Sequence, residues 1–269
     1  MLQVSRSGFY DWQERRPSAR AVETARLDEA IKRLYAAHHR RPGSPKMTRL
    51  LAAEGWEVSQ SRVARRMRHL GLRSVVRRAW RTTTDSRHRL PVAPNLVARQ
   101  FAASGPDQTW VSDITYLRTR KGWLYLVVII DLYSRLVVGW ALSASLSHHA
   151  LLKALRRAIG RRRPARGLVF HSDRGIQYAC GDFTRALATH GCVQSMSRRG
   201  DVWDNAVAES FFHLLKSELV HHVFWEGYAD AHRDLFEYIE IYYNRERLHS
   251  TLGYLSPAQF ELQTAKLAA

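Results

Sequence analysis

Apolar residues recur at the spacing of a helix along the first 72 residues. A helix is predicted over residues 18–36, with Ser18 as its N-cap and an apolar face formed by Val22, Leu27, Ile31 and Leu34. A Pro/Gly-rich segment around Gly43 then breaks the chain. Two short helices are predicted beyond it, over residues 46–54 and 59–70, with Ser59 as a second N-cap and Gly71 as a stop.

The second of these short helices combines an apolar stripe with a basic remainder. Its apolar residues fall at i, i+4 and i+7, and its other faces carry Arg62, Arg65, Arg66 and Arg68. Two short helices, a tight turn and a basic second helix are typical of a helix-turn-helix, in which these arginines would contact DNA. An ordinary solvated helix pair fits this stretch equally well.

Residues 73–104 predict a basic linker. Prolines interrupt it, and Asp85 is its only acid up to residue 99. Such a connector can track a phosphate backbone or act as a flexible tether. The arginines we expect at DNA here are Arg77, Arg78 and Arg81.

From Thr109 the pattern changes to runs of β-branched and aromatic residues. Strands over 110–117, 123–131 and 136–144, with short connections, predict an antiparallel meander. A helix over 147–160 and a short buried strand over 168–170 follow, and further helices are predicted near 182–190, 205–219 and 228–243. This order predicts an α/β domain with a mixed sheet and flanking helices over 105–262, a tail over 263–269, and an all-helical region over 1–72 before the linker.

Charge points to a polyanionic partner. The chain has a formal net charge of +18, and residues 1–100 carry 22 Lys and Arg against 8 Asp and Glu. The other 169 residues carry 20 against 16, so the excess lies at one end. Nucleic acid is the usual partner of such an end, and a solubility surface or an anionic membrane surface are the alternatives.

Other compositional features predict a cytoplasmic protein. The first residues have no apolar segment typical of a secretory signal, and the longest apolar run, 124–130, is far shorter than the roughly 20 residues that span a bilayer. The two cysteines, Cys180 and Cys192, do not make a disulfide framework, which fits a reducing compartment. We therefore expect no membrane partner.

Three carboxylates are placed where a hydrolytic or transfer site could form. Asp113 interrupts the first predicted strand, Asp173 follows the fourth, and Glu209 lies on the helix near 205–219. A carboxylate among apolar strand residues is costly unless it is paired or binds a metal. Three of them could bind Mg²⁺, which prefers oxygen ligands, but each could equally form a structural ion pair or cap.

The residues around these carboxylates resemble the DDE transposases of bacterial insertion sequences, relatives of the retroviral integrases with a ribonuclease H-like core. The similar segments are WVSDITYL, HSDRGIQY, WDNAVAESFFHLLKSEL and YYNRERLHSTLGYLSP. The spacing of that family, 35 residues between the second Asp and the Glu, separates Asp173 from Glu209. The likeness extends over roughly residues 3–260 and is closest to the branch encoded by the second of two overlapping frames.

The resemblance implies a function as well as a fold. It implies that Asp113, Asp173 and Glu209 are catalytic and bind two Mg²⁺ ions, for which Mn²⁺ can substitute. It implies that Lys216, two helical turns after Glu209, contacts DNA near the scissile end. The implied reaction is DNA strand cleavage and strand transfer, with one element end attacking the same strand at the other end to give a circular intermediate.

The expected partners follow from the same resemblance. They are the terminal repeats of the element, target DNA, and at least one further copy of the chain in a synaptic complex at the bacterial nucleoid. Family members are often fused to an upstream-frame product with its own helix-turn-helix and leucine zipper, so that product is a further expected partner. Two positions depart from the family pattern: Arg41 precedes the Pro-Gly pair, and Val202 precedes Trp203.

Several polar residues near the carboxylates are assigned supporting roles. His171 is expected to orient Asp173 or to pack, with DNA contact as the alternative. Asp131, at the end of the second predicted strand, is expected to be structural rather than a fourth ligand. Asp204 or Asn205 is expected to cap the helix that carries Glu209.

The remaining polar groups have structural interpretations. The cluster of Asn244, Arg245, Arg247 and His249 predicts a C-terminal cap network, with DNA contact as the alternative. The thirteen histidines and two cysteines lack zinc-ligand spacing, and the two cysteines are expected to pack. Tyr242 and Tyr243 lack the Arg/His surroundings of a tyrosine recombinase.

Two other functions remain as alternatives to a transposase. One is a helix-turn-helix regulator with an inactive core, although the presence of all three carboxylates argues against an inactive core. The other is a hydrolytic nuclease of the same fold that never joins strands.

Overall fold

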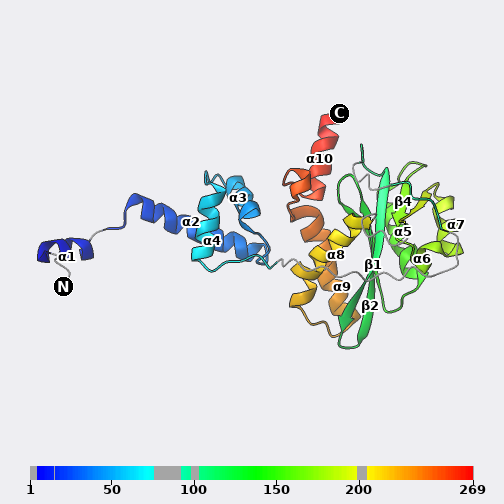
Figure 1. Cartoon of the computed structure of the whole chain (residues 1–269), viewed down its shortest axis with the longest axis horizontal. Coiled ribbons are helices and arrows are strands. Elements are labelled where there is room, and N and C mark those ends of the chain that lie inside the picture. The colour runs from blue at the N-terminus through cyan, green and yellow to red at the C-terminus, as the bar shows by residue number, and fades with distance from the viewer. Residues whose placement is uncertain (1–4, 15, 76–91, 98–102, 199–204, 269) are drawn as a thin grey trace. The chain divides into compact units, whose positions relative to one another are not determined.

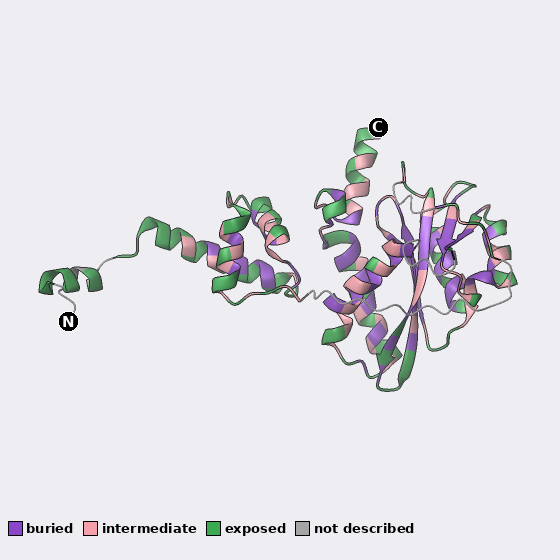
Figure 2. Cartoon of the chain, viewed as in Figure 1, coloured by how far each residue is buried: buried purple, intermediate pink, exposed green. Residues whose placement is uncertain are grey.

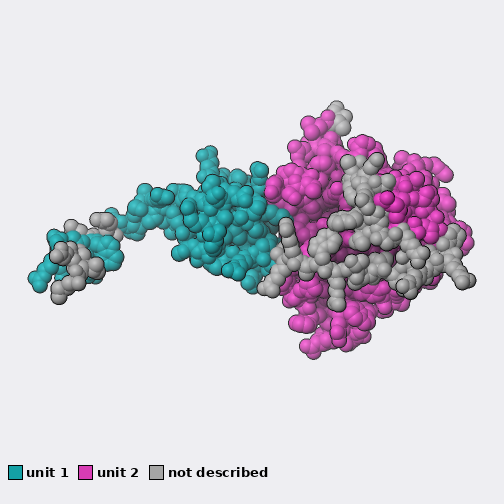
Figure 3. Space-filling model, in the orientation of Figure 1, with its two compact units in different colours: residues 1–75 teal, residues 76–269 magenta. Residues whose placement is uncertain are grey.

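The computed structural model describes residues 5–14, 16–75, 92–97, 103–198 and 205–268 of the 269-residue chain (Figure 1). They fall into two compact units, Met1–Val75 and Val76–Ala269, which Figure 3 distinguishes by colour. Most of the predicted linker, including Arg77, Arg78 and Arg81, lies outside the described residues.

The first unit is entirely helical. Its elements are α1 (Arg6–Glu14), α2 (Ala19–Ala37), α3 (Ser44–Ala53) and α4 (Gln60–His69). The last three helices enclose one apolar core that includes Leu27, Ile31, Met47, Leu51, Val63 and Met67. Burial of these side chains against one another is what holds three short helices together, because isolated helices of about ten residues are marginal in water.

The predicted helix signals of this unit are confirmed. The Ser18 hydroxyl accepts a hydrogen bond from the Ala21 amide at 3.2 Å, and the Ser59 hydroxyl accepts one from the Arg62 amide at 3.3 Å. Gly71 adopts φ +68°, a left-handed conformation that ends a helix. Val22 is an exception, since it is 42% exposed and does not join the core, because the first turns of α2 extend beyond α3 and α4 (Figure 1).

The second unit is built on a five-stranded mixed sheet with the order β3-β2-β1-β4-β5. The predicted meander is confirmed, because β1 (Thr109–Thr119), β2 (Gly122–Asp131) and β3 (Val137–Ser143) pair antiparallel. β4 (Val169–Ser172) lies parallel to β1, and β5 (Val193–Met196) lies parallel to β4. The parallel pairing brings the end of β4 beside the middle of β1.

Helices cover both faces of this sheet (Figures 1 and 2). One apolar core joins α5 (His148–Arg162), α6 (Ile176–Ala179) and α7 (Gly181–Thr189) to Trp110 and Val127. The other joins α8 (Ala206–Glu218) and α9 (Tyr228–Phe236) to Val111 and Val128. Successive strand residues therefore face opposite helical layers, as a pleated strand requires. The predicted mixed sheet with flanking helices is confirmed.

Two 3₁₀ turns and one π-helical segment follow α8 in this unit. A 3₁₀ turn, Val220–His222, follows α8, and a π-helical segment, Glu237–Glu246, continues α9. A second 3₁₀ turn, Ser250–Leu252, precedes the last helix. Among the helices of the described ranges, none has the length and apolar character needed to cross a bilayer.

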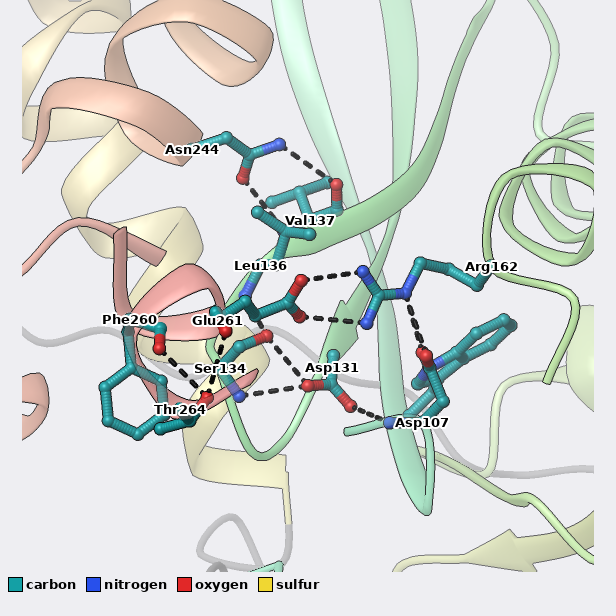
Figure 4. Close-up of polar contacts among 11 residues, drawn as sticks. Asp107, Asp131, Ser134, Leu136, Val137, Arg162, Asn244, Phe260, Glu261 and Thr264 are labelled. Carbon is teal, nitrogen blue, oxygen red and sulfur yellow. Dashed lines mark hydrogen bonds and ion pairs between the residues drawn. The ribbon is translucent and has the colours of Figure 1, made fainter. Parts of the chain in front are cut away.

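The last helix, α10 (Pro257–Ala268), is held by an ion pair with α5 and by a ring contact with the turn after β2 (Figure 4). Arg162 donates to both carboxylate oxygens of Glu261, at 2.8 and 2.9 Å, and also to Asp107, at 2.9 and 3.0 Å. The ring of Phe260 packs against that of Tyr133, with the ring centroids 5.2 Å apart. Residues 263–268, predicted as a tail, thus continue a helix.

The C-terminal end of α8 is fixed by a buried ion pair. The Arg247 guanidinium donates to the Glu218 carboxylate at 2.8 and 3.1 Å, and the Tyr238 hydroxyl donates to the same carboxylate at 2.8 Å. Both charged residues are buried. Although burial by itself lowers the pKa of Arg247, the Glu218 carboxylate raises it above its ordinary value.

The segment that supplies Arg247 is also bonded to the sheet. The side-chain oxygen of Asn244 accepts from the Val137 amide at 2.9 Å, and its NH₂ group donates to the Val137 carbonyl at 3.1 Å (Figure 4). His249 is buried, whereas Arg245 is exposed. The positions of Asn244, Arg247 and His249 agree with the structural interpretation of this cluster.

Replacing Arg247 with Ala should destabilise the second unit by about 3–5 kcal/mol, because Glu218 would remain buried and charged without its partner. The free energy of unfolding can be measured by urea denaturation followed by circular dichroism. The matched control is Arg185→Ala, which removes an exposed ion pair with Asp182 and should cost about 0–1 kcal/mol. Equal effects of the two substitutions would contradict a dominant role for the buried pair.

Candidate active site

Asp113 lies in the middle of β1, on the face covered by α8. It pairs across the strands with Val128, and its neighbours on the same face, Val111 and Leu117, belong to the core that α8 shares. One of its carboxylate oxygens accepts a hydrogen bond from the Ile114 amide at 2.8 Å. The strand therefore directs a carboxylate toward α8 from within the apolar face of the sheet.

Asp173 is brought beside Asp113 by the register of the parallel strands. Ser112 of β1 pairs with Ser172 of β4, so Asp113 and Asp173 are the next residues along the two chains. An Asp173 oxygen accepts from the Gly175 amide at 2.9 Å. A Cβ atom on Gly175 would lie 3.0 Å from that carboxylate, so the tight turn favours glycine.

Glu209 lies in the first turn of α8, and Asn205 joins the start of this helix to β1. The Asn205 side-chain NH₂ group donates to the Ser112 carbonyl at 3.2 Å, and the residue is buried. Asn205 occupies the N-cap position of α8 but makes no side-chain capping bond, and Asp204, the other predicted cap, lies outside the described residues. The Asn205 amide instead contacts the strand, immediately before Asp113.

The electrostatics of these residues show that they form one cluster. Burial raises the pKa of Asp113 well above its ordinary value, and the negative charges of Asp173 and Glu209 raise it further. Burial and the charge of Asp173 likewise raise the pKa of Glu209. Asp113 and Glu209 are therefore harder to ionise because Asp173 is near, which is characteristic of carboxylates that share a site.

Lys216 belongs to the same cluster. Burial lowers the pKa of its ammonium group, and the charge of Asp113 acts in the opposite direction. Lys216 in turn lowers the pKa of Asp113. The structure thus brings together the four core residues for which the sequence predicts catalysis and DNA contact at the scissile end.

Tyr178 and Ser112 form a buried support that was not predicted from the sequence. The Ser112 hydroxyl donates to the Val128 carbonyl at 2.8 Å and lies 3.0 Å from the Tyr178 hydroxyl, which can donate to it. Burial and the charges of Asp113 and Asp173 raise the pKa of Tyr178 well above its ordinary value. A tyrosine five residues after Asp173 has no charge or periodicity that marks it in the sequence.

The two other supporting residues lie outside the cluster. His171 is buried, with its Nδ1 2.8 Å from the Ser195 hydroxyl and its Nε2 3.3 Å from the Ser197 hydroxyl, so it packs β4 against β5. Asp131 is buried and accepts hydrogen bonds from the Asp107 amide and from the amide and hydroxyl of Ser134 (Figure 4). These contacts support the structural role expected for Asp131.

The chemistry of the cluster fits hard cations. Its donors are carboxylate oxygens, which Mg²⁺ prefers, and the mutual repulsion of the carboxylates would be relieved by positive charge. Within the ranges that the structure describes, however, no three His, Cys, Asp or Glu side chains converge closely enough to ligate one ion as they stand.

The arginines of α4 divide into two pairs with different surroundings. Arg62 and Arg66 face α2, where Arg62 contacts Glu23 at 2.8 Å and Arg66 binds both oxygens of Asp28, at 2.8 and 2.5 Å. Arg65 and Arg68 are exposed and make no ion pair within the described residues. Only the second pair is presented to a partner without loss of a contact within the unit.

Replacing Asp113 with Asn should stabilise the protein at pH 7 in the presence of a chelator. The folded-state pKa of Asp113 is raised above its unfolded-state value, which is near 4. The free energy of unfolding therefore falls as pH rises from the unfolded-state pKa to the folded-state pKa, because the folded protein opposes ionisation of this group. We expect a rise in Tm of a few degrees at pH 7 that disappears near pH 4, measured by differential scanning calorimetry. The exposed control Glu237→Gln should leave Tm unchanged at both pH values, and an equal rise in it would contradict the clustering.

Comparisons with known proteins agree with this architecture. Two family models described as "Integrase core domain" match residues 103–202 and 209–265, and one described as "HTH-like domain" matches residues 23–80. A chain of the simian T-cell lymphotropic virus intasome, in a cryo-electron microscopy structure with the PP2A regulatory subunit B56 gamma, superposes with a TM-score of 0.51. That chain is 14% identical, and the match covers 86% of this chain and 74% of the viral one. At this identity the likeness shows the fold alone.

Similar sequences extend over nearly the whole chain. The transposase InsF for insertion sequence IS3A of Escherichia coli (strain K12) is 41% identical over 263 residues, which are 97% of this chain and 91% of InsF. The insertion element IS600 uncharacterized 31 kDa protein of Shigella sonnei is also 41% identical, over 99% of this chain and 98% of its own length. With its HTH-like region and its ribonuclease H-like integrase core, the chain belongs to the IS3 family of insertion-sequence transposases.

Proposed function

We propose that Asp113, Asp173 and Glu209 are the catalytic residues of DNA strand cleavage and strand transfer by this transposase. The observation that carries the proposal is that β1, the end of β4 and α8 bring these three carboxylates near enough for the charge of one to raise the pKa of another. Convergence of separate elements on one set of repelling acids is costly for folding, and a cationic site is its ordinary purpose.

We infer that the three carboxylates hold two Mg²⁺ ions, with Mn²⁺ as a substitute. When bound, such ions activate an attacking oxygen and neutralise charge on the phosphate. The part of the protein is to keep the carboxylates together against their repulsion. Asn205 and the Ser112–Tyr178 contact do this by joining α8 and α6 to β1.

The proposed reaction has two phosphoryl transfers. Water attacks a phosphodiester at the element end, the P–O3′ bond breaks, and a 3′-OH leaves with the proton balance restored by solvent. This 3′-OH then loses its proton to solvent and attacks the phosphorus of a second phosphodiester. A new P–O bond forms as the P–O3′ bond of that phosphodiester breaks, and its 3′ oxygen leaves and takes up a proton. Since each transfer is a direct displacement that positioning and electrostatic stabilisation can catalyse, no covalent protein intermediate is needed.

We infer that the DNA partners are the terminal repeats of the element and the target. Joining one end to the other, as in a circular intermediate, needs two ends in one complex, which implies a dimer or larger assembly. The upstream-frame product of the element is proposed as a further partner. The place of action is then the bacterial cytoplasm, at the nucleoid, where these DNA partners lie.

Replacing Glu209 with Gln should abolish formation of joined element ends while DNA binding is retained. The loss should be on the order of 10³-fold or more, since a ligand of a site that supplies several kcal/mol of charge stabilisation is removed. Outward-facing primers on a plasmid that carries the native locus measure the circle junction, and supplying the upstream frame tests whether that product is needed. Glu237→Gln, exposed on the segment after α9, is the control and should behave as wild type.

The same variant separates the alternatives. Full junction formation by Glu209→Gln would overturn the catalytic assignment. Cleaved ends without any joined product from the wild-type protein would identify a hydrolytic nuclease. As a readout independent of activity, Mg²⁺ should raise the Tm of the wild-type protein and of Glu237→Gln, but much less that of Glu209→Gln, because ligand binding stabilises only a protein that retains the site.

The exposed arginines of α4 should contribute to DNA affinity through phosphate or base contacts. Replacing Arg65 or Arg68 with Ala should reduce the slope of log K against log salt by about 1 if the side chain neutralises one phosphate. Arg66→Ala should instead lower the stability of the first unit, because Arg66 lowers the pKa of Asp28 through their ion pair. Titration of labelled element ends at several salt concentrations, with thermal melts beside it, checks both. Similar behaviour of all three variants would contradict the division.

A further inference from the structure

The end of the β1–β2 hairpin carries exposed aromatic and basic side chains that the catalytic cluster does not use. Trp123 is 54% exposed and Tyr116 is 48% exposed, and Phe224 in the adjacent loop is 92% exposed. Arg118 and Lys121 lie among them and are exposed. We call these five residues the aromatic–basic end of the hairpin.

The strand register places four aromatic and basic residues on one face of the hairpin. Tyr116 pairs with Tyr125, and Arg118 pairs with Trp123. The Arg118 guanidinium lies 6.0 Å from the Trp123 ring centroid, and the two tyrosine rings meet edge to face with their centroids 5.3 Å apart. These contacts order the side chains along the hairpin, and the Tyr116 and Trp123 side chains stay about half exposed. Figure 2 shows this end of the hairpin as exposed.

This part of the hairpin is uncovered because of the sheet topology. β4 pairs with β1 only from Thr109 to Ser112, so within the described residues the edge of β1 has no strand partner beyond that point. Val127 is the last residue of this face on β2 that the α5 layer buries. Beyond this point the hairpin is uncovered on this face, while Leu117 and Leu124 on the other face stay buried in the core shared with α8.

Contacts of the residues next to Phe224 fix the loop that exposes it. Trp225 is buried in the α8 core, and its ring nitrogen donates to the Asp234 carboxylate at 2.8 Å. The loop is joined to the hairpin by backbone bonds from Arg120 to Trp225 at 3.0 Å and from Lys121 to Glu226 at 3.3 Å. These contacts fix the loop at the hairpin while the Phe224 side chain stays exposed to solvent, where a partner can contact it.

The charge of this end is positive. Arg118, Arg120 and Lys121 stand against one acid, Glu226, which pairs with Arg120 at 3.2 Å. Exposed rings with basic neighbours favour a partner that has both flat π surfaces and negative charge. Unpaired nucleotides have both, whereas the bases of an intact duplex are stacked on each other.

We propose that the aromatic–basic end of the hairpin binds a single-stranded segment of DNA, with Trp123 and Phe224 as stacking platforms. Arg118 follows Asp113 by five residues, about 17 Å along an extended strand. This odd separation puts the two side chains on opposite faces of the sheet. A strand that is unpaired beside the cut would therefore cross the open edge of β1 to reach this end. Its position beside the cut rests on the proposed catalytic function, but the binding itself does not.

The test uses the full chain without added metal, and a fluorescently labelled oligo(dT) strand of about 16 nucleotides, near the upper size for one such platform. Trp123→Ala and Phe224→Ala should each weaken binding of this strand roughly 5- to 100-fold, the range for loss of one stacked base. Arg118→Gln should weaken it and reduce its salt dependence. Affinity for a duplex of equal length should change less than about twofold.

Matched controls lie elsewhere on the second unit. Phe236→Ala removes an aromatic ring of similar exposure from α9, and Arg156→Ala removes an exposed arginine from α5. Both should bind oligo(dT) as the wild type does. In the wild-type chain, photo-crosslinking of a bromodeoxyuridine strand should label the peptides that contain Trp123 or Phe224, a readout that does not depend on any variant folding.

The proposal is overturned if the two aromatic variants bind oligo(dT) as tightly as the controls, or if crosslinks fall only on other peptides. It is also overturned if these variants lose self-association in sedimentation experiments with unchanged strand binding, which would identify a protein interface. Glu209→Gln should keep full strand binding. Failure of the catalytic proposal and failure of this one are therefore distinguishable.

Discussion

Helix α8 is held at both ends by buried polar contacts, and the position of Glu209 depends on them. At its start, Asn205 donates to the carbonyl of Ser112. At its end, the buried Glu218 carboxylate accepts hydrogen bonds from Arg247 and Tyr238. Burying such an ion pair contributes little net stability compared with apolar packing, but breaking it is severe. The pair therefore acts mainly by excluding other positions of the helix.

The cluster of Asp113, Asp173 and Glu209 illustrates the opposite energetic balance. The register of β1 and β4 makes Asp113 and Asp173 neighbours, and α8 adds Glu209, although each charge opposes ionisation of another. This repulsion is a local cost that the surrounding packing offsets. The closeness of the carboxylates lowers the stability of the protein without metal, and the same closeness would raise its affinity for divalent cations.

The parts of the fold with a strong local signal could be predicted from the sequence. Ser18 and Ser59 cap their helices as expected, and the β-branched runs form the meander. The short strand β5 was missed because four residues, two of them polar, carry too little periodicity. Val22 matched the apolar spacing of its helix, yet no neighbouring helix reaches it. Spacing gives the face of a helix but not where its partners end.

The candidate site was predicted through the motifs, whereas its supports depend on tertiary contacts. A local rule suggested that Asn205 caps α8, but its amide contacts a strand 93 residues earlier in the chain. The four arginines of α4 were alike in sequence, and only the position of Glu23 and Asp28 on α2 separates them. Neither contact leaves a pattern within a window of neighbouring residues.

The division among those arginines has a consequence for how such elements diverge. Arg62 and Arg66 maintain the packing of α4 on α2, so they constrain the unit whichever DNA it meets. Arg65 and Arg68 carry no such duty within the described residues. Under the proposed DNA contacts of Arg65 and Arg68, substitutions at these two positions would change the preferred sequence with little loss of fold stability. A transposase could thus follow drift in the ends of its own element by single steps.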